Sequence, residues 1–112
     1  MFSALRSIAF LLFQIVVTPV YALAMIATFW LPPVPRYRIA AHWCWINLQG
    51  VRTLCGIRWR VDGLANIPAD TMAAPHIVMS KHSSTWETLA LNLYFPPLAF
   101  VAKKELLAIP FF

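Results

Sequence analysis

With 112 residues, the chain has room for one small domain at most, which excludes a large soluble core. Hydrophobic residues make up 61% of the sequence and charged residues only 12%, roughly half of the usual charged fraction, so the composition indicates a membrane protein. The net charge of +5 would suit nucleic acid or an anionic lipid surface, but the basic residues flank apolar segments and form no dense polar stripe, so we expect a lipid surface as partner and no nucleic acid.

The first predicted element is a membrane anchor. The uncharged stretch from Ile8 to Leu31 would form a helix of ~36 Å, which is long enough to cross the hydrocarbon core. This stretch is too long for the apolar part of a signal peptide. Pro19 would kink the helix and leaves a shallow, re-entrant placement open. Arg36 and Arg38 follow closely, and this positive bias predicts that the C-terminal side lies in the cytoplasm.

The second predicted element, residues 36–55, is an amphipathic helix that completes a membrane-associated region over residues 1–55. The apolar positions that recur at helical spacing are Ile39, Trp43, Ile46, Gly50 and Leu54. The opposite face carries Arg38, His42, Gln49 and Arg52. This pattern is typical of a helix that lies in the membrane surface or packs against the anchor. An apolar stripe alone fits an ordinary core-facing helix equally well.

The cysteines and histidines predict no metal site. Cys44 and Cys55 lack the spacing of metal ligands, so we expect two reduced structural thiols. His42 and His76 form no ligand cluster with His82.

Residues 56–112 predict the N-terminal part of an α/β domain. Three short runs are typical of strands: residues 57–61, 76–80 and 98–102. A helix is expected from Ser84 to about Tyr94, and a second, short helix is expected to open at Lys103. The order strand, helix, strand predicts a right-handed crossover between two parallel strands.

A histidine and a carboxylate five positions apart follow the second of these runs. His82 could act as a general base, and Glu87 could fix its tautomer and stabilise its charged form. The same segment also fits a simple helix start, because Ser84 and Glu87 make a capping box. Lys103 follows the next predicted strand. Since ligand sites lie at the carboxyl ends of parallel strands, we expect His82 and Lys103 on the same rim of the sheet.

Two blocks of the sequence resemble the bacterial 1-acyl-sn-glycerol-3-phosphate acyltransferases, also called lysophosphatidic acid acyltransferases. The segment from His82 to Glu87 is similar to the first motif of that family, a histidine, four residues and an acid. The segment from Phe100 to Phe112 looks like the second block, and the distance between the two blocks also fits. The two N-terminal helices are similar to the membrane-binding region of the family, so the resemblance covers nearly the whole chain.

The resemblance implies a glycerolipid-acyltransferase-type α/β fold and the transfer of an acyl chain from acyl-CoA or acyl carrier protein to the free hydroxyl of lysophosphatidate, giving phosphatidate. His82 would then be the general base, with Glu87 orienting it. Lys103, with Lys104 as a weaker candidate, would bind the substrate phosphate. No cofactor is implied besides the acyl donor. The implied location is the bacterial inner membrane, with membrane phospholipid as a partner and the active site on the cytoplasmic face.

The chain departs from the family in two places. Glu87 stands where the family usually has aspartate, and the sequence ends before the Glu-Gly-Thr-Arg motif. We therefore expect an N-terminal fragment that carries half of an active site and is inactive by itself. Two alternatives stay open. One is an acyltransferase that uses glycerol 3-phosphate or another lipid alcohol, and the other is a non-catalytic membrane protein that binds acidic lipid.

Overall fold

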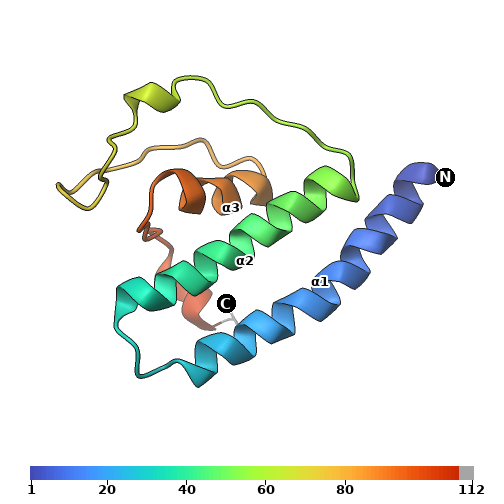
Figure 1. Ribbon diagram of the computed structural model, residues 1–112, viewed down its shortest axis with the longest axis horizontal. Coiled ribbons are helices and arrows are strands. Elements are labelled where there is room, and N and C mark those ends of the chain that lie inside the picture. The colour runs from blue at the N-terminus through green and yellow to red at the C-terminus, as the bar shows by residue number, and fades with distance from the viewer. Residues whose placement is uncertain (109–112) are drawn as a thin grey trace.

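The computed structural model describes residues 1–108 as three α-helices with two short 3-10 helices; a short turn joins the first two α-helices and a long loop joins the second and third (Figure 1). The helices are α1 (Phe2–Ala27), α2 (Pro33–Thr53) and α3 (Thr85–Tyr94), and the 3-10 turns are η1 (Leu64–Asn66) and η2 (Lys104–Ala108). Helix α2 packs against α1 on one side and against α3 on the other, whereas α1 and α3 do not pack together. The middle helix therefore organises the molecule.

Helix α1 is the apolar element that the sequence predicts. It is the one helix in residues 1–108 that is long and apolar enough to cross a membrane by its length and composition. None of its side chains is buried in the structure, and Pro19 lies inside it. A long apolar helix without a protein partner on most of its surface is typical of a lipid-facing element.

Helix α2 turns back and runs antiparallel to α1. At one end of this α1–α2 hairpin, the Tyr21 hydroxyl lies 2.5 Å from Nδ1 of His42. At the other end, the guanidinium of Arg6 lies against Gly56, just beyond α2. Pro33 is favourable in the first turn of α2, where its missing N–H has no helical partner. Of the placements left open by the sequence, two are observed together: α2 packs against the anchor and also faces a small core formed with α3.

The prediction of one apolar and one polar face on α2 was wrong, because the helix is covered on two sides. Ile46 and Gly50 face α1, but so do His42 and Gln49, which were predicted on the opposite face. The most deeply buried α2 side chains lie instead in the contact with α3.

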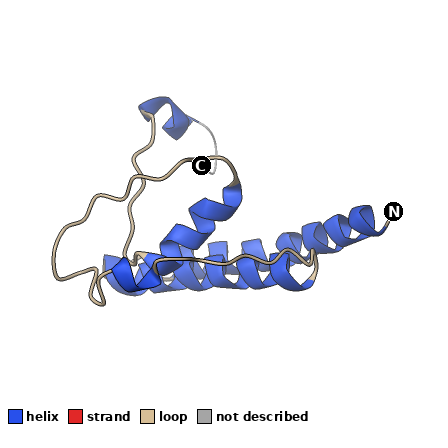
Figure 2. Cartoon of the chain, turned by 90° about the horizontal axis from the view of Figure 1, so that it is seen from above, coloured by secondary structure: helices blue, strands red, loops and turns tan. Residues whose placement is uncertain are grey.

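Helix α3 crosses α2 obliquely, with its chain direction roughly reversed, and closes a small core (Figure 2). The Tyr37 hydroxyl donates a 2.9 Å hydrogen bond to the carbonyl of Asn92, while the Trp59 and Trp86 rings meet edge to face at 5.5 Å. The buried side chains of this core are Cys44, Asn47, Leu48, Leu89 and Ala90. Both cysteines are free thiols, as the sequence predicts, and Cys44 is buried.

The three predicted strands are not observed. Within residues 1–108 the chain forms no β-structure, and segments 57–61, 76–80 and 98–102 run as loops (Figure 2). A strand needs a neighbour to pair its N–H and C=O groups, and none of these segments lies beside a partner in a ladder. Many of their apolar side chains are accordingly exposed, Ile77 and Met79 to 93% each, whereas Trp59, Val61, Val78 and Leu98 are half-buried. The α/β part of the predicted fold is therefore not seen, and the described residues are all-helical.

The last predicted element is present as the 3-10 helix η2, one residue after the expected start. The final four residues of the second sequence block, 109–112, lie outside the described residues.

Candidate active site

The start of α3 is fixed by the capping box that the sequence predicts. Ser84 is the N-cap, and its backbone is extended with φ −154° and ψ 172°. Its hydroxyl accepts a hydrogen bond from the Trp86 amide at 3.3 Å, while its own amide donates to Oε1 of Glu87 at 2.7 Å. Such reciprocal bonds satisfy amide groups that lack partners inside the first turn of a helix.

The same carboxylate also holds His82. Oε1 of Glu87 lies 3.0 Å from Nδ1 of the imidazole, so one oxygen serves both the helix cap and the histidine. The His82 side chain is 79% exposed and the Glu87 side chain only 17%. The carboxylate therefore lies beneath the imidazole and leaves most of the ring accessible from outside.

Hydrogen bonds keep Glu87 ionised. The pKa of its carboxyl is lowered from 4.5 to about 2, firstly because the Ser84 hydroxyl donates to Oε2 at 2.5 Å and secondly because the Ser84 amide donates to Oε1. The Ser83 amide, 2.5 Å from Oε1, adds to this effect. A carboxylate that is charged throughout the neutral range can stabilise a protonated imidazole.

Packing places this pair at the end of α2 where Thr53 and the following loop lie. The first turn of α3 lies beside the segment that follows α2, because Trp86 meets Trp59 there. Arg52 in the last turn of α2 and Arg58 surround a small hollow that also contacts Trp59. Two cations are therefore linked to this turn through Trp59.

The structure does not bring the two lysines to the pair. Within residues 1–108, neither Lys103 nor Lys104 forms an ion pair, and both are exposed. Lys103 precedes η2 and Lys104 is its first residue, and η2 follows the C-terminal end of α3. Glu87, in contrast, lies in the first turn of α3. Figure 1 shows η2, in red, apart from the loop that enters α3. The shared rim expected for His82 and Lys103 depends on two paired strands, and these are not formed here.

Two contacts at the site were not anticipated from the sequence. The Ser83 amide reaches Glu87, and Glu87 serves as cap and histidine partner at once instead of one or the other. The capping box is the signal that could have indicated the first contact, because a carboxylate that turns back to the N-cap amide also lies near the amide of the residue before it. No group of three or more His, Cys, Asp or Glu side chains that could hold a metal comes together in the described part of the chain.

Comparison with known proteins supports the resemblance that the two sequence blocks indicate. Over 83 residues the chain is 46% identical to the 1-acyl-sn-glycerol-3-phosphate acyltransferase of Pseudomonas aeruginosa. The aligned part covers 73% of this chain and 31% of that enzyme, so the chain spans about a third of its relative. No family model and no solved structure matches the chain. The chain is thus related to these acyltransferases over most of its length.

Proposed function

We propose that this relative of the 1-acyl-sn-glycerol-3-phosphate acyltransferases serves acyl transfer in phospholipid synthesis, moving an acyl chain from acyl-CoA or acyl carrier protein to the free hydroxyl of lysophosphatidate. The observation that carries the proposal is the 3.0 Å contact between Nδ1 of His82 and Oε1 of Glu87. It leaves Nε2 of an exposed ring free to take a proton from an alcohol.

In the proposed reaction, His82 removes the proton of the acceptor hydroxyl as its oxygen attacks the carbonyl carbon of the thioester. A C–O bond forms, the C–S bond breaks, and the departing thiolate takes the proton back from the imidazolium. Glu87 keeps the imidazole in one orientation and stabilises its positive charge during the step, the role an acid plays beside histidine in hydrolase triads. Phosphatidate and free CoA or carrier protein are the products.

We further propose that residues 56–112 contribute to an α/β domain and residues 1–55 to membrane attachment. In that domain, segments 76–80 and 98–102 would pair as neighbouring parallel strands, and their carboxyl ends would bring His82 and Lys103 to one rim. Lys103 would then contact the substrate phosphate as a point charge, with Lys104 in a secondary role. Support comes from the exposure of Ile77, Met79, Phe100 and Val101 and from the backbones of both segments, which pair with no other strand in the described part of the chain.

The bacterial inner membrane is the proposed location, with His82 on the cytoplasmic face. The α1–α2 hairpin returns the chain to the end where it began, so Arg6, Arg52 and Arg58 gather at one end and Arg36 and Arg38 at the other. We propose that the end with Arg6, Arg52 and Arg58 faces the cytoplasm, because it carries more basic residues than the other end. This differs from the expectation drawn from Arg36 and Arg38, which did not anticipate that α2 turns back along α1. His82 lies at that end, because the first turn of α3 packs beside the segment that follows α2.

The decisive experiment is acyl transfer by the product of the gene that carries these residues, assayed in membranes with labelled acyl-CoA and lysophosphatidate. His82→Ala is expected to lower the rate by ~10²–10⁴-fold, the usual contribution of a general base. His76→Ala is the matched control, since His76 is an exposed loop histidine close by in the sequence. Equal rates in both variants would remove His82 from the mechanism.

The acceptor is tested in the same assay. Glycerol 3-phosphate offered in competition with lysophosphatidate is expected to leave phosphatidate as the main product. If glycerol 3-phosphate is acylated preferentially, the reaction class stands but the proposed acceptor is wrong.

A further inference from the structure

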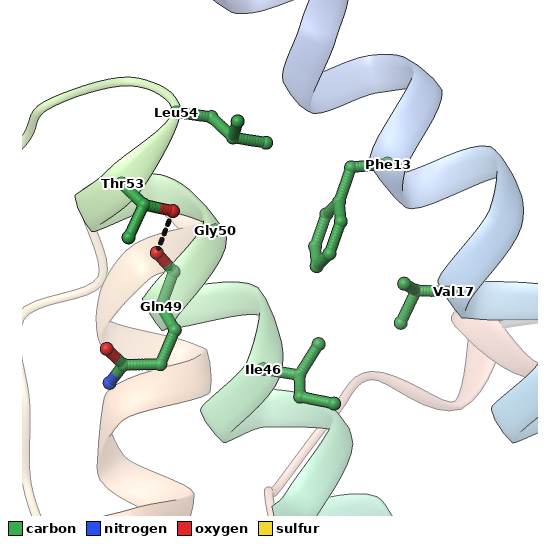
Figure 3. A pocket seen from close by; sticks show the side chains of 7 residues that line it. All are labelled: Phe13, Val17, Ile46, Gln49, Gly50, Thr53 and Leu54. Carbon is green, nitrogen blue, oxygen red and sulfur yellow. Dashed lines mark hydrogen bonds between the residues drawn. The ribbon is translucent and has the colours of Figure 1, made fainter.

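An open apolar groove runs between α1 and α2, on the side of α2 away from α3 (Figure 3). Its volume is about 340 Å³, and the lining residues are Phe13, Val17, Ile46, Gln49, Gly50, Thr53 and Leu54. Phe13 and Val17 point from α1 toward the side chains of Ile46 and Leu54 on α2. All four are only half-buried, so the space between the helices is not filled by the protein itself.

The groove offers nothing for a polar ligand. The Thr53 hydroxyl donates to the carbonyl of Gln49 at 2.8 Å, so it is already satisfied within the helix. The amide group of the Gln49 side chain points away from the space between the helices (Figure 3). The occupant must therefore be apolar, and lipid is the apolar material that surrounds a helix such as α1.

The groove is long enough for part of one lipid tail. Its lining on α2 runs from Ile46 to Leu54, which is ~12 Å at 1.5 Å per residue. A tail that continues along α1 from Val17 to the level of Arg6 would cover ~16 Å, roughly half of the ~30 Å hydrocarbon core of a bilayer.

A free cation lies at one end of this path. The guanidinium of Arg6 rests against Gly56, two residues beyond Leu54, and a Cβ built on that glycine would lie 3.0 Å from one terminal nitrogen and 3.1 Å from the other. No acidic side chain in the described residues pairs with Arg6. Arg52, in the last turn of α2, adds a second exposed cation at this end of the hairpin. The charge is complementary to an anionic headgroup.

We propose that the α1–α2 groove binds one acyl chain of an anionic membrane phospholipid, whose headgroup phosphate contacts Arg6. Helix α2 lies between this groove and α3, so the bound lipid is separated from His82 and is not the acyl acceptor. The lipid completes the packing of the hairpin, and the proposal is independent of the acyl-transfer function.

Native mass spectrometry of the purified full chain tests the site, with phosphatidylglycerol and phosphatidylcholine of identical acyl chains as probes. One phosphatidylglycerol is expected to remain bound. Val17→Trp fills the groove. This variant is expected to lower the fraction of protein that binds phosphatidylglycerol at least tenfold, as estimated from the 1–3 kcal/mol cost of overpacking. Val16→Trp is the matched control, because Val16 is the neighbouring valine, is 67% exposed and lies outside the groove. Ile46→Trp repeats the test from α2 if Val17→Trp loses its helical circular dichroism.

The headgroup contact is tested with charge variants. Arg6→Gln is expected to reduce the preference for phosphatidylglycerol over phosphatidylcholine roughly tenfold, the size of one charge-assisted hydrogen bond. Arg38→Gln removes the same charge at the opposite end of the hairpin and should leave the preference unchanged. The proposal is overturned if Val16→Trp loses as much phosphatidylglycerol as Val17→Trp, if the wild type shows no preference for phosphatidylglycerol over phosphatidylcholine, or if inorganic phosphate displaces phosphatidylglycerol.

Discussion

The two sides of α2 are covered to very different degrees. Toward α3, Cys44, Leu48, Leu89 and Ala90 are each at most 9% exposed and form a closed core. Toward α1, every apolar side chain that lines the groove is only half-buried, and α1 itself has no buried residue. One helix thus presents a face packed like a water-soluble protein and a face left open. The difference indicates that protein completes the first face and lipid the second.

The largest expected effect comes from cavity-forming substitutions on the two faces. Leu48→Ala is expected to lower the free energy of unfolding by about 2–5 kcal/mol, since the closed core cannot collapse around the missing atoms. Ile46→Ala, on the open face, should cost less than about 2 kcal/mol, because a half-buried side chain leaves no closed cavity. Urea unfolding in detergent, followed by circular dichroism, compares the two. Equal losses would mean that both faces are equally closed.

Larger side chains test the same difference between the two faces of α2, by adding volume instead of removing it. Ala90→Leu inserts three carbons into the α3 contact and is expected to cost about 1–3 kcal/mol. On the open face, a Cβ at Gly50 would lie 2.8 Å from the far edge of the Phe13 ring. That ring can turn into the groove, so Gly50→Ala should change stability by less than about 1 kcal/mol, with the gain in helix propensity offsetting the shift. A melting temperature that falls as far for Gly50→Ala as for Ala90→Leu would contradict this.

The capping box of α3 holds the first turn of the helix that forms the closed face. Its contribution to the free energy of unfolding should depend on pH. Ser84→Ala is expected to cost about 0.5–2 kcal/mol, the usual loss of an N-cap. The pKa of Glu87 is lower in the folded chain than in the unfolded one, so its contribution is fully present above pH 4.5 and is lost as the pH falls toward 2. Circular dichroism between pH 6 and 2 measures this. Glu87→Gln keeps the cap and should flatten that part of the pH profile.

The smallest effect is expected at the one polar side chain of the closed core. Asn47 is fully buried, and its amide nitrogen donates to the Trp43 carbonyl at 2.8 Å while its Oδ1 has no hydrogen-bond partner. Asn47→Leu has a similar volume and removes the unsatisfied oxygen, so stability should stay within about 1 kcal/mol or rise. If Asn47→Leu instead lowers the free energy of unfolding by a large amount, this face depends on a polar network and not on apolar packing.

The helices were predictable because their signals are local. The apolar run of α1, the recurring apolar positions of α2 and the capping box of α3 are each short-range patterns. The start of α2 was predicted at residue 36, whereas the helix begins at Pro33. The contact of His82 with Glu87 was predictable for the same reason, because both residues lie close together in the sequence at the start of α3.

The features that could not be predicted depend on partners distant in the sequence. An apolar run such as 76–80 is a strand only where another segment pairs with it, and the described residues supply none. The position of Lys103 relative to His82 depends on that pairing. The two-sided covering of α2 was also missed, since an apolar stripe does not tell how many neighbours a helix has.

Glu87 gives the site a sensitivity to temperature. Its single carboxylate anchors the first turn of α3 and the His82 ring together, so the imidazole is held only in molecules whose first turn is intact. Helix ends fray at a far smaller free-energy cost than a core unfolds. Warming would therefore release the histidine while Leu48 and Leu89 are still packed, so the contact between His82 and Glu87 would be lost before the fold melts.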